Sequence, residues 1–235
     1  MLVLFDIDGT LLQSQSAGVH AMGAALSELH GTAPDFSKVS IHGRLDTLIW
    51  RDLAAVHGYP TCDESHGRFR ETYGSHLERR LAERNTVVRY PGAKELVDAT
   101  LAHPGLTVGL LTGNYEFTGR LKVRHAGIDP DAFTVNAWAG DAPDRRGLVT
   151  VAMRRFAERT GGTIAGDRVV IIGDTPHDVD CAHHSGARCL AVATGHFTVD
   201  QLREAGADLV VPTLADTAGL VRWIAGSSVP GHPGT

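Results

Sequence analysis

In the segment LVLFDIDGT at residues 2–10, an unbroken apolar run ends at two aspartates, Asp6 and Asp8. A run without polar alternation is typical of a strand that is buried on both faces, as in a parallel sheet. Side chains alternate along a strand, so both carboxylates would share one face if the strand continued. Gly9 permits a sharp turn after them. Open α/β sheets bind ligands at the carboxyl ends of their strands, so the stretch predicts a first strand that carries a functional site.

Later apolar runs resemble the first one and also stop at Gly, Thr, Asp or Pro. They lie at residues 106–111, 168–172, 189–193 and 208–211. Helical patterns separate several of them, at residues 93–102 between two Pro-Gly pairs and at residues 148–159 before a Gly-Gly pair. This alternation predicts an α/β fold with a doubly wound parallel sheet. Right-handed crossovers would then place the carboxyl ends of all strands on one edge.

A long helical insertion interrupts this rhythm directly after the first strand. It shows no buried-strand run, and its helical patterns lie at residues 17–30, 45–57 and 62–83. We therefore expect an α/β core made of residues 1–13 and 86–225, with a helical domain at residues 14–85. The Gly-, Pro- and Ser-rich residues 226–235 are expected to form a disordered tail.

The composition restricts the classes of function. The chain of 235 residues has 22 Lys and Arg against 27 Asp and Glu, a net charge of −5, and no basic run that follows a helix face, so no nucleic-acid partner is expected. Its three cysteines form no CxxC pair, which fits a reducing compartment. It has no signal-peptide pattern and no run of about 20 apolar residues. We expect a cytoplasmic protein that contacts no membrane.

Two further segments follow apolar runs and complete a set of motifs. Thr112-Gly113-Asn114 follows the run at 106–111, and GDTPHD at residues 173–178 follows the run at 168–172. With FDIDGT, these segments resemble the haloacid dehalogenase superfamily, whose motifs are DxDGT, a strand ending in Ser or Thr, and GDxxxD. The family places a Lys or Arg between the last two. Because no Lys follows Lys122, the DRRGL segment at residues 144–148 offers Arg145 or Arg146, and its likeness to a DRxxL pattern favours Arg145.

The resemblance spans Phe5 to Asp178 and implies a Rossmann-like core with a helical cap of the superfamily's first class. It also implies a Mg²⁺ site, to which Asp6 and Asp174 give carboxylates and Asp8 its backbone carbonyl, with Asp178 supporting them. Mg²⁺ is a hard cation that takes carboxylate, carbonyl and phosphate oxygens. By the same resemblance, Asp6 is the nucleophile that forms an aspartyl-phosphate, and Asp8 is the general acid and then the general base.

The resemblance also implies which residues bind the phosphate. The Thr112 hydroxyl and the backbone N–H groups of Gly113 and Asn114 would hold phosphoryl oxygens. Arg145 would neutralise the phosphate and stabilise the intermediate.

The segment HGRLD at residues 42–46 lies between two predicted cap helices. It resembles a G-R-T-D segment of phosphoglycolate phosphatase-like members, with Leu45 in place of the Thr. One interpretation is that Arg44 reaches a second anionic group on the substrate. The other is a plain turn at Gly43, followed by a helix start at Arg44–Asp46.

The predicted function is Mg²⁺-dependent hydrolysis of a small phosphate monoester, either phosphoglycolate-like or a sugar phosphate. One alternative is a phosphomutase of the beta-phosphoglucomutase type, which shares the same motifs. Another is a 2-haloacid dehalogenase, which needs no Mg²⁺ and usually lacks an acidic residue two positions after the nucleophile, so Asp8 counts against it. The expected partner is a small phosphorylated metabolite, and the expected state is a monomer or homodimer.

Overall fold

The computed structural model describes residues 1–226, so the predicted tail at residues 226–235 lies outside the described residues apart from Gly226. Within them, the main sheet is parallel and has the order β4-β1-β5-β6-β7. Its strands are β1 (Leu2–Phe5), β4 (Thr107–Leu110), β5 (Val169–Gly173), β6 (Arg188–Val192) and β7 (Leu209–Val211). This sheet confirms the predicted α/β fold class with a doubly wound parallel sheet.

The strand register places the motif segments at one edge of the sheet. Phe5 at the end of β1 lies opposite Leu110 of β4 on one side and Ile172 of β5 on the other. Asp6 therefore follows its strand beside the segments that lead to Thr112 and Asp174. Parallel strands hold their carboxyl ends together in this way, which is why residues far apart in the sequence meet.

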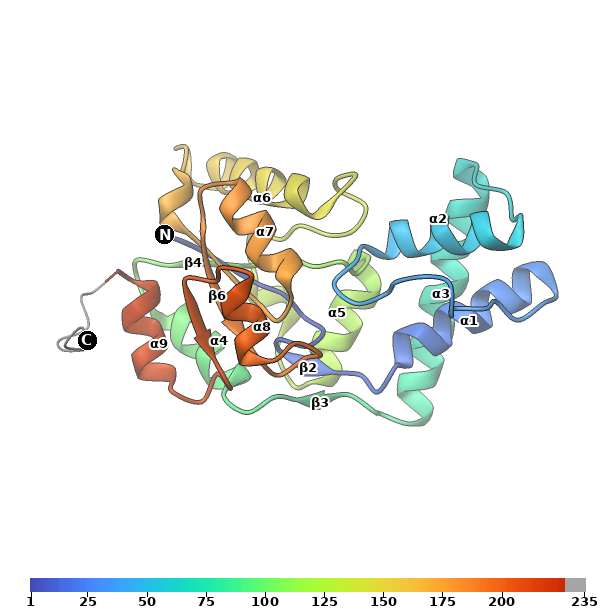
Figure 1. The fold of residues 1–235 in the computed structure, drawn as a ribbon, viewed down its shortest axis with the longest axis horizontal. Helices are drawn as coiled ribbons and strands as arrows, with labels where there is room; N and C mark the ends of the chain where they lie inside the picture. Colours follow the sequence, from blue (N-terminus) through green and yellow to red (C-terminus); the bar gives the residue numbers. More distant parts are fainter. Residues whose placement is uncertain (227–235) are drawn as a thin grey trace.

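Helices flank the sheet and fill the insertion. They are α1 (Ala17–His30), α2 (Asp46–His57), α3 (Asp63–Glu83), α4 (Ala93–Ala102), α5 (Glu116–His125), α6 (Arg145–Thr160), α7 (Pro176–His184), α8 (Val199–Glu204) and α9 (Thr217–Ile224), with short 3-10 turns η1 (Pro130–Ala132) and η2 (Gly166–Arg168). Figure 1 shows α6 and α7 side by side on one side of the strands and α4 with α9 on the other. Helices α1, α2 and α3 lie together away from the sheet.

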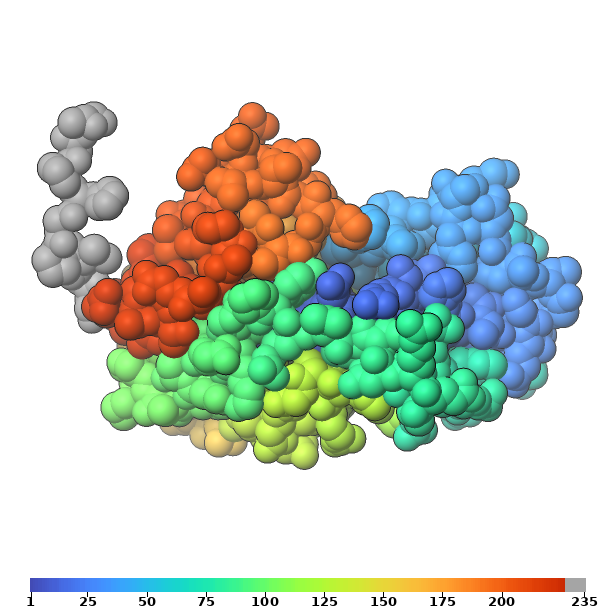
Figure 2. All heavy atoms as spheres, turned by 90° about the horizontal axis from the view of Figure 1, so that it is seen from below, coloured from blue at the N-terminus to red at the C-terminus, as the bar shows by residue number. Residues whose placement is uncertain are grey.

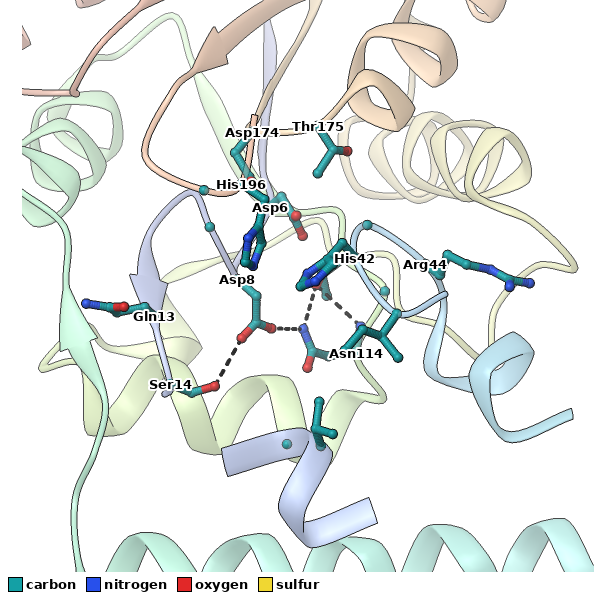
Figure 3. Close-up of a pocket in the computed structure, with 18 of the residues that line it drawn as sticks. Asp6, Asp8, Gln13, Ser14, His42, Arg44, Asn114, Asp174, Thr175 and His196 are labelled. Atoms are coloured by element: carbon teal, nitrogen blue, oxygen red, sulfur yellow. Dashed lines mark hydrogen bonds between the residues drawn. The ribbon is translucent and has the colours of Figure 1, made fainter. Parts of the chain in front are cut away.

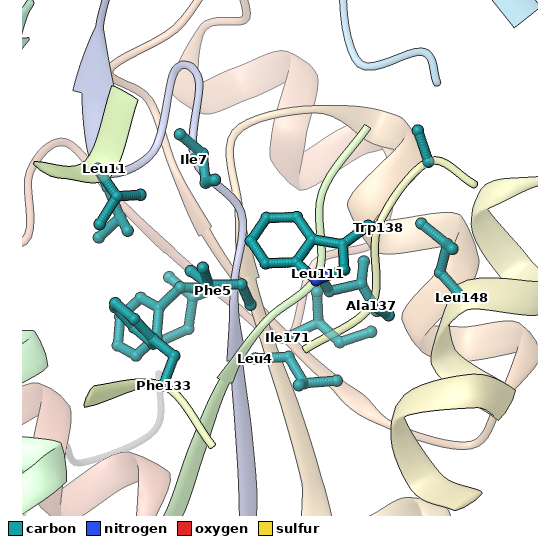
Figure 4. Close-up of a cluster of buried hydrophobic side chains, with 14 of the residues drawn as sticks. Leu4, Phe5, Ile7, Leu11, Leu111, Phe133, Ala137, Trp138, Leu148 and Ile171 are labelled. Carbon is teal, nitrogen blue, oxygen red and sulfur yellow. The ribbon is translucent and has the colours of Figure 1, made fainter. Parts of the chain in front are cut away.

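The core beneath the site is built from aliphatic and aromatic side chains of the central strands. Leu4, Phe5 and Ile171 have no exposed surface, and Phe5 meets Phe133 edge to face with ring centroids 6.4 Å apart (Figure 4). Fully burying such a side chain contributes roughly 1.5–3 kcal/mol. This packing fixes the position of the carboxyl end of β1, which Asp6 directly follows.

Two chain crossings connect the helical domain to the core. There β2 (Leu12–Gln13) pairs antiparallel with β3 (Val88–Arg89), an element that the sequence patterns do not predict. Gln15 and Ser16 follow with positive φ angles of 47° and 61°, an uncommon conformation for residues other than glycine. Figure 2 shows the helical domain (blue to cyan) directly against the core (orange, red and green).

Across residues 1–226, the helices are too short or too polar to span a lipid bilayer.

Candidate active site

Three predicted carboxylates meet at the sheet edge. Asp6, Asp174 and Asp178 each place a carboxylate oxygen within 4.8 Å of the others, and all three side chains are buried. Asp6 continues β1, where its N–H donates to the carbonyl of Ile172 at 2.9 Å. Asp174 follows β5, and Asp178 lies in the first turn of α7. The sheet and the following helix therefore assemble an all-oxygen cluster of the kind that holds a hard divalent cation.

Glycines leave the space that these carboxylates occupy. A Cβ atom added to Gly9 or Gly195 would lie 2.2 Å or 1.8 Å from Asp174 Oδ2, and one added to Gly173 would lie 2.0 Å from Asp178 Cγ. Gly9 also has a φ of +86°, which side-chain-bearing residues rarely adopt. The backbone thus closes tightly around Asp174, whose Oδ1 accepts a hydrogen bond from the Thr10 hydroxyl at 3.1 Å.

The cluster carries excess negative charge in a buried place. Burial raises the pKa of Asp6 to about 6, opposed by the neighbouring Arg145 and reinforced by Asp178. Burial also raises the pKa of Asp174 well above its usual value, and the charges of Asp6 and Asp178 add to this. Desolvated carboxylates that repel each other are stabilised by a cation between them. The cluster therefore fits the divalent metal that the sequence predicts.

Arg145 and Arg146 have different environments, although they are adjacent in the chain. Asp144 caps α6 by accepting a hydrogen bond from Gly147 N–H at 2.8 Å, which starts the helix at Arg145. Arg145 is 8% exposed, and its Nη2 lies 3.1 Å from Asp6 Oδ2 and 2.5 Å from Asp178 Oδ1. Arg146 pairs with Asp180 at 2.6 Å on the surface. The structure brings Arg145 to the site and leaves Arg146 outside.

Asp178 holds Arg145 and also begins α7. Its Oδ1 accepts from the Arg145 Nε and Nη2 groups, and its Oδ2 accepts from the N–H and hydroxyl of Thr175. Both oxygens are therefore engaged, which suits the supporting role predicted for Asp178. The carboxylate oxygens of Asp6 and Asp174 have fewer hydrogen-bond partners than those of Asp178, so they are the better placed to bind a metal ion.

The predicted phosphate-binding segment follows β4 and faces the carboxylates. The Thr112 hydroxyl accepts from Asn114 Nδ2 at 2.9 Å, and both residues are buried. Among the hydrogen bonds of residues 1–226, none uses the Gly113 N–H. A donor without an internal partner at the edge of a cavity is suited to an anionic oxygen.

Asp8 is held by a lysine that sequence reasoning missed. Its Oδ2 accepts from Lys122 Nζ at 2.7 Å and from Asn114 Nδ2 at 2.8 Å, while Ser14 donates weakly to Oδ1 at 3.4 Å. Lys122 Nζ also donates to Asn114 Oδ1 at 2.7 Å. Figure 3 shows Asp8 between Asp6 and Ser14, with Asn114 beside it. Lys122 is 5% exposed and joins the predicted acid to the phosphate-binding segment.

The cap meets the phosphate-binding segment through Asp46, a second residue that sequence reasoning did not assign to the site. Its N–H donates to the Gly113 carbonyl at 2.7 Å, and its Oδ2 accepts from Tyr115 N–H at 3.2 Å. A Cβ added to Gly113 would lie 2.2 Å from the carbonyl oxygen of Arg44, so only glycine allows this approach. Burial raises the pKa of Asp46 to about 7, opposed by Lys122 and by the bond from Tyr115.

The structure does not bring the Arg44 guanidinium to the site. Arg44 Nη1 pairs with Asp52 Oδ2 at 2.5 Å, and the side chain points away from the carboxylates (Figure 3). The helix-start interpretation of Arg44–Asp46 describes the local geometry, because α2 begins at Asp46. Next to it, the rings of His42 and His196 lie 3.8 Å apart and join the cap to the loop after β6.

A cavity of about 440 Å³ lies between the core residues and the cap. Its core side includes Asp6, Asp8, Thr112 and Asp174. Its cap side comes from α1 and the residues just before it, from α2, from the loop between these helices and from Tyr73 of α3. This volume is within the range of sites for small molecules. The cavity thus brings the predicted nucleophile Asp6, the predicted acid Asp8, the predicted phosphate-binding segment and the carboxylate cluster to one place.

The chain matches the family model described as haloacid dehalogenase-like hydrolase over residues 3–183. It belongs to the haloacid dehalogenase-like hydrolase family. This confirms the resemblance inferred from the motifs.

Curated relatives of this hydrolase are distant. It is 24% identical over 220 residues to "Probable phosphatase IndB" of Dickeya dadantii, covering 93% of this chain and 92% of the relative. It is 28% identical to "Tyrosine-protein kinase PtkA" of Mycobacterium tuberculosis, covering 87% and 72%. It is 26% identical to "Phosphoglycolate phosphatase" of Rhodospirillum rubrum, covering 94% and 90%. The family and the relatives named as phosphatases together identify an enzyme of the phosphatase type.

Solved structures share the fold. A hydrolase from Pseudomonas syringae aligns with a TM-score of 0.70 at 23% identity, covering 94% of this chain and 98% of that one. The beta-phosphoglucomutase of Clostridium difficile aligns with a TM-score of 0.72 at 16% identity, covering 96% of each chain. Both likenesses extend over the core and the cap.

Proposed function

We propose that this hydrolase is a Mg²⁺-dependent phosphatase that cleaves a small phosphate monoester through a covalent phosphate on Asp6. One observation carries the proposal: the buried carboxylates of Asp6, Asp174 and Asp178 converge within 4.8 Å, beside Thr112 and its phosphate-binding segment. A cation cluster next to anion donors is what a phosphate dianion requires, because a lone carboxylate nucleophile would repel it. The phosphatases among the relatives support the same reaction class.

Asp6 and Asp174 would hold the metal with their carboxylates, and Asp8 with its backbone carbonyl. When bound, Mg²⁺ would neutralise charge on the phosphoryl oxygens and on the surrounding carboxylates. Burial raises the pKa of Asp6 to about 6, which supports the presence of positive charge beside its carboxylate. Arg145 supplies part of it from the chain itself.

The chain's own residues account for the two chemical steps. A carboxylate oxygen of Asp6 attacks phosphorus, the bond from phosphorus to the ester oxygen breaks, and Asp8 gives its proton to the departing oxygen. Asp8 then takes a proton from water, whose oxygen attacks phosphorus, and the bond to Asp6 breaks to release phosphate. The Gly113 and Asn114 N–H groups and Thr112 hold the phosphoryl oxygens, while Arg145 offsets their charge.

A phosphate-release assay with and without Mg²⁺ tests this function. We expect activity on a generic aryl phosphate to stop in EDTA and return with excess Mg²⁺. We expect Asp6→Asn to lower turnover by at least about 10³-fold, because the nucleophile is lost. Asp180→Asn, an exposed aspartate paired with Arg146, is the matched control and should keep normal activity. Full activity in EDTA, or normal turnover by Asp6→Asn, would refute the mechanism.

The phosphomutase alternative makes a different prediction for the same preparation. A mutase would require a bisphosphate activator and would release little free phosphate from a sugar phosphate. The structural likeness to beta-phosphoglucomutase concerns the fold alone. The cytoplasmic location and the monomeric or homodimeric state stay predictions from the sequence.

A further inference from the structure

We infer that the leaving group of the substrate is uncharged and apolar, and that a subsite on the cap binds it. The subsite, here called the apolar wall, consists of Val19, Met22, Phe36, Ile41 and Ile49, all of which line the cavity. This inference rests on the proposed phosphatase function and names its substrate class. It departs from the expectation of a phosphoglycolate-like or sugar phosphate substrate.

The apolar wall is built from three parts of the cap. Helix α1 supplies Val19 and Met22, the loop before α2 supplies Phe36 and Ile41, and α2 supplies Ile49. Met22 is 3% exposed and Ile49 is 5% exposed, so both are fixed by packing in the main hydrophobic cluster. Phe36 and Ile41 pack against that cluster and keep part of their surface open. Such a surface gains by burying an apolar group and offers little to a hydroxyl-rich one.

The position of Asp8 directs the leaving group toward this wall. Asp8 must face the ester oxygen to protonate it, so the leaving group lies on the Asp8 side of the phosphorus. Asp8 contacts Ser14, which stands three residues before the start of α1, and Figure 3 shows Asp8 pointing from Asp6 toward Ser14. A group that leaves past Asp8 therefore meets the part of the cavity that α1 lines.

Charge in the cavity disfavours a second anionic group. Four acidic residues line it: Asp6, Asp8, Asp46 and Asp174. Both cations directed into it within the described residues are already paired, Arg145 with Asp6 and Asp178, and Lys122 with Asp8. The Arg44 guanidinium is engaged by Asp52. A carboxylate or second phosphate on the leaving group would enter without a free lysine or arginine to offset its charge.

Two esters with matched leaving groups test the subsite: benzyl phosphate and 4-carboxybenzyl phosphate. Both release a benzylic alcohol, so the chemistry of bond breaking is similar and the carboxylate is the main difference. We expect benzyl phosphate to have a kcat/KM at least about tenfold higher, because the carboxylate would sit unpaired against the apolar wall.

Two substitutions to lysine test whether the apolar wall is the source of the preference for benzyl phosphate. Ile41→Lys places an ammonium in the wall at a half-buried loop position, and should shift the ratio by about tenfold toward 4-carboxybenzyl phosphate. Val56→Lys is the matched control, because Val56 is 41% exposed on α2 and does not line the cavity. It should leave the ratio unchanged. Thermal unfolding of both variants checks that they fold.

The outcomes separate the subsite from the proposed function. Equal or faster cleavage of the carboxylate ester by the natural chain would overturn the apolar subsite while leaving the phosphatase intact. A preference that Ile41→Lys does not move would also overturn it, because the wall would not be its source. Phosphate release from neither ester, with generic aryl phosphates also uncleaved, would refute the phosphatase itself and the inference with it.

Discussion

The core half and the cap half of the cavity are built on different principles. In the core half, buried charges meet specific partners, as Arg145 does with Asp6 and Asp178. In the cap half, the apolar wall lines part of the cavity and the Arg44 guanidinium pairs with Asp52 away from the carboxylates. Under the proposed function, the sheet edge carries out the reaction and the cap selects the leaving group. Substitutions in the core half should therefore affect both rate and stability, and those in the apolar wall mainly selectivity.

The largest expected effect separates two adjacent arginines. Arg145→Met should lower kcat/KM by about 100-fold, since a charge aimed at the phosphate is lost. It should also lower the free energy of unfolding by about 3–5 kcal/mol, because Asp6 and Asp178 are left buried without their partner. Arg146→Met breaks only a half-exposed pair and should change stability by less than about 1 kcal/mol. Activity assays and urea unfolding check both variants. Equal effects of the two substitutions would mean that α6 does not turn Arg145 toward the carboxylates and Arg146 toward solvent.

Asp46 should have the next largest effect, which is on the pH dependence of the free energy of unfolding. Burial raises its pKa from an ordinary value near 3.8 to about 7 in the folded protein. Between these values the folded state keeps a proton that the unfolded state has lost, so the free energy of unfolding falls as pH rises through this window. The expected loss is on the order of 4 kcal/mol, and it is complete above pH 7. Below about pH 4 both states are protonated and the penalty is absent.

Urea unfolding at several pH values without added metal measures this slope. Asp46→Asn should unfold with a flatter dependence between pH 4 and 7 than the natural chain, because the amide does not titrate. Asp98→Asn, which removes an exposed partner of Lys94, should retain the natural slope. The remaining slope in all three proteins comes from other buried carboxyl groups such as Asp6 and Asp174. Parallel curves for Asp46→Asn and the natural chain would contradict the burial of a titrating Asp46.

Lys122 should have a smaller effect that falls on turnover rather than binding. Lys122→Met removes the bridge between Asp8 and Asn114, so the acid loses its fixed position next to the leaving oxygen. We expect kcat to fall by about tenfold with little change in KM, and Lys122→Arg to recover part of it. Lys94→Met, at a half-exposed lysine on α4, serves as the control. A rise in KM at constant kcat would instead make Lys122 a substrate ligand.

Residues at strand ends were predictable from the sequence, because a strand's register determines their place. The runs before Asp6, Thr112 and Asp174 are apolar and short, and parallel pairing leaves them only one edge at which to meet. Arg145 rather than Arg146 faces the site because Asp144 is the N-cap residue of α6. Neighbouring residues of a helix point about 100° apart. Because the Asp144 side chain fixes where α6 begins, one arginine faces the site and the other faces solvent.

Contacts between distant helices were not predictable in this way. Lys122 lies 114 positions from Asp8, on a helix whose sequence EFTGRLKVRH is polar and contains Gly119, so no periodicity marks it. The pairing of β2 with β3 involves two residues on each side, which is too short to leave a pattern. Asp46 resembles an ordinary first-turn acid of a helix. Only its place against Gly113 and Tyr115 makes it part of the site.

Arg44 should give the smallest effect and the sharpest test of the cap half. In the structure its guanidinium pairs with Asp52, and the two side chains are 26% and 42% exposed. An ion pair with that exposure contributes at most about 1 kcal/mol, and its loss does not alter the cavity. Arg44→Ala should therefore leave kcat/KM for benzyl phosphate within about twofold of the natural chain. Because the Arg44 carbonyl rather than its side chain packs on Gly113, alanine keeps the contact that positions the phosphate-binding segment. A tenfold loss confined to substrates with a second anionic group would show that Arg44 leaves Asp52 and enters the cavity when such a ligand binds, and the cap half would then have the cation that this structure turns outward.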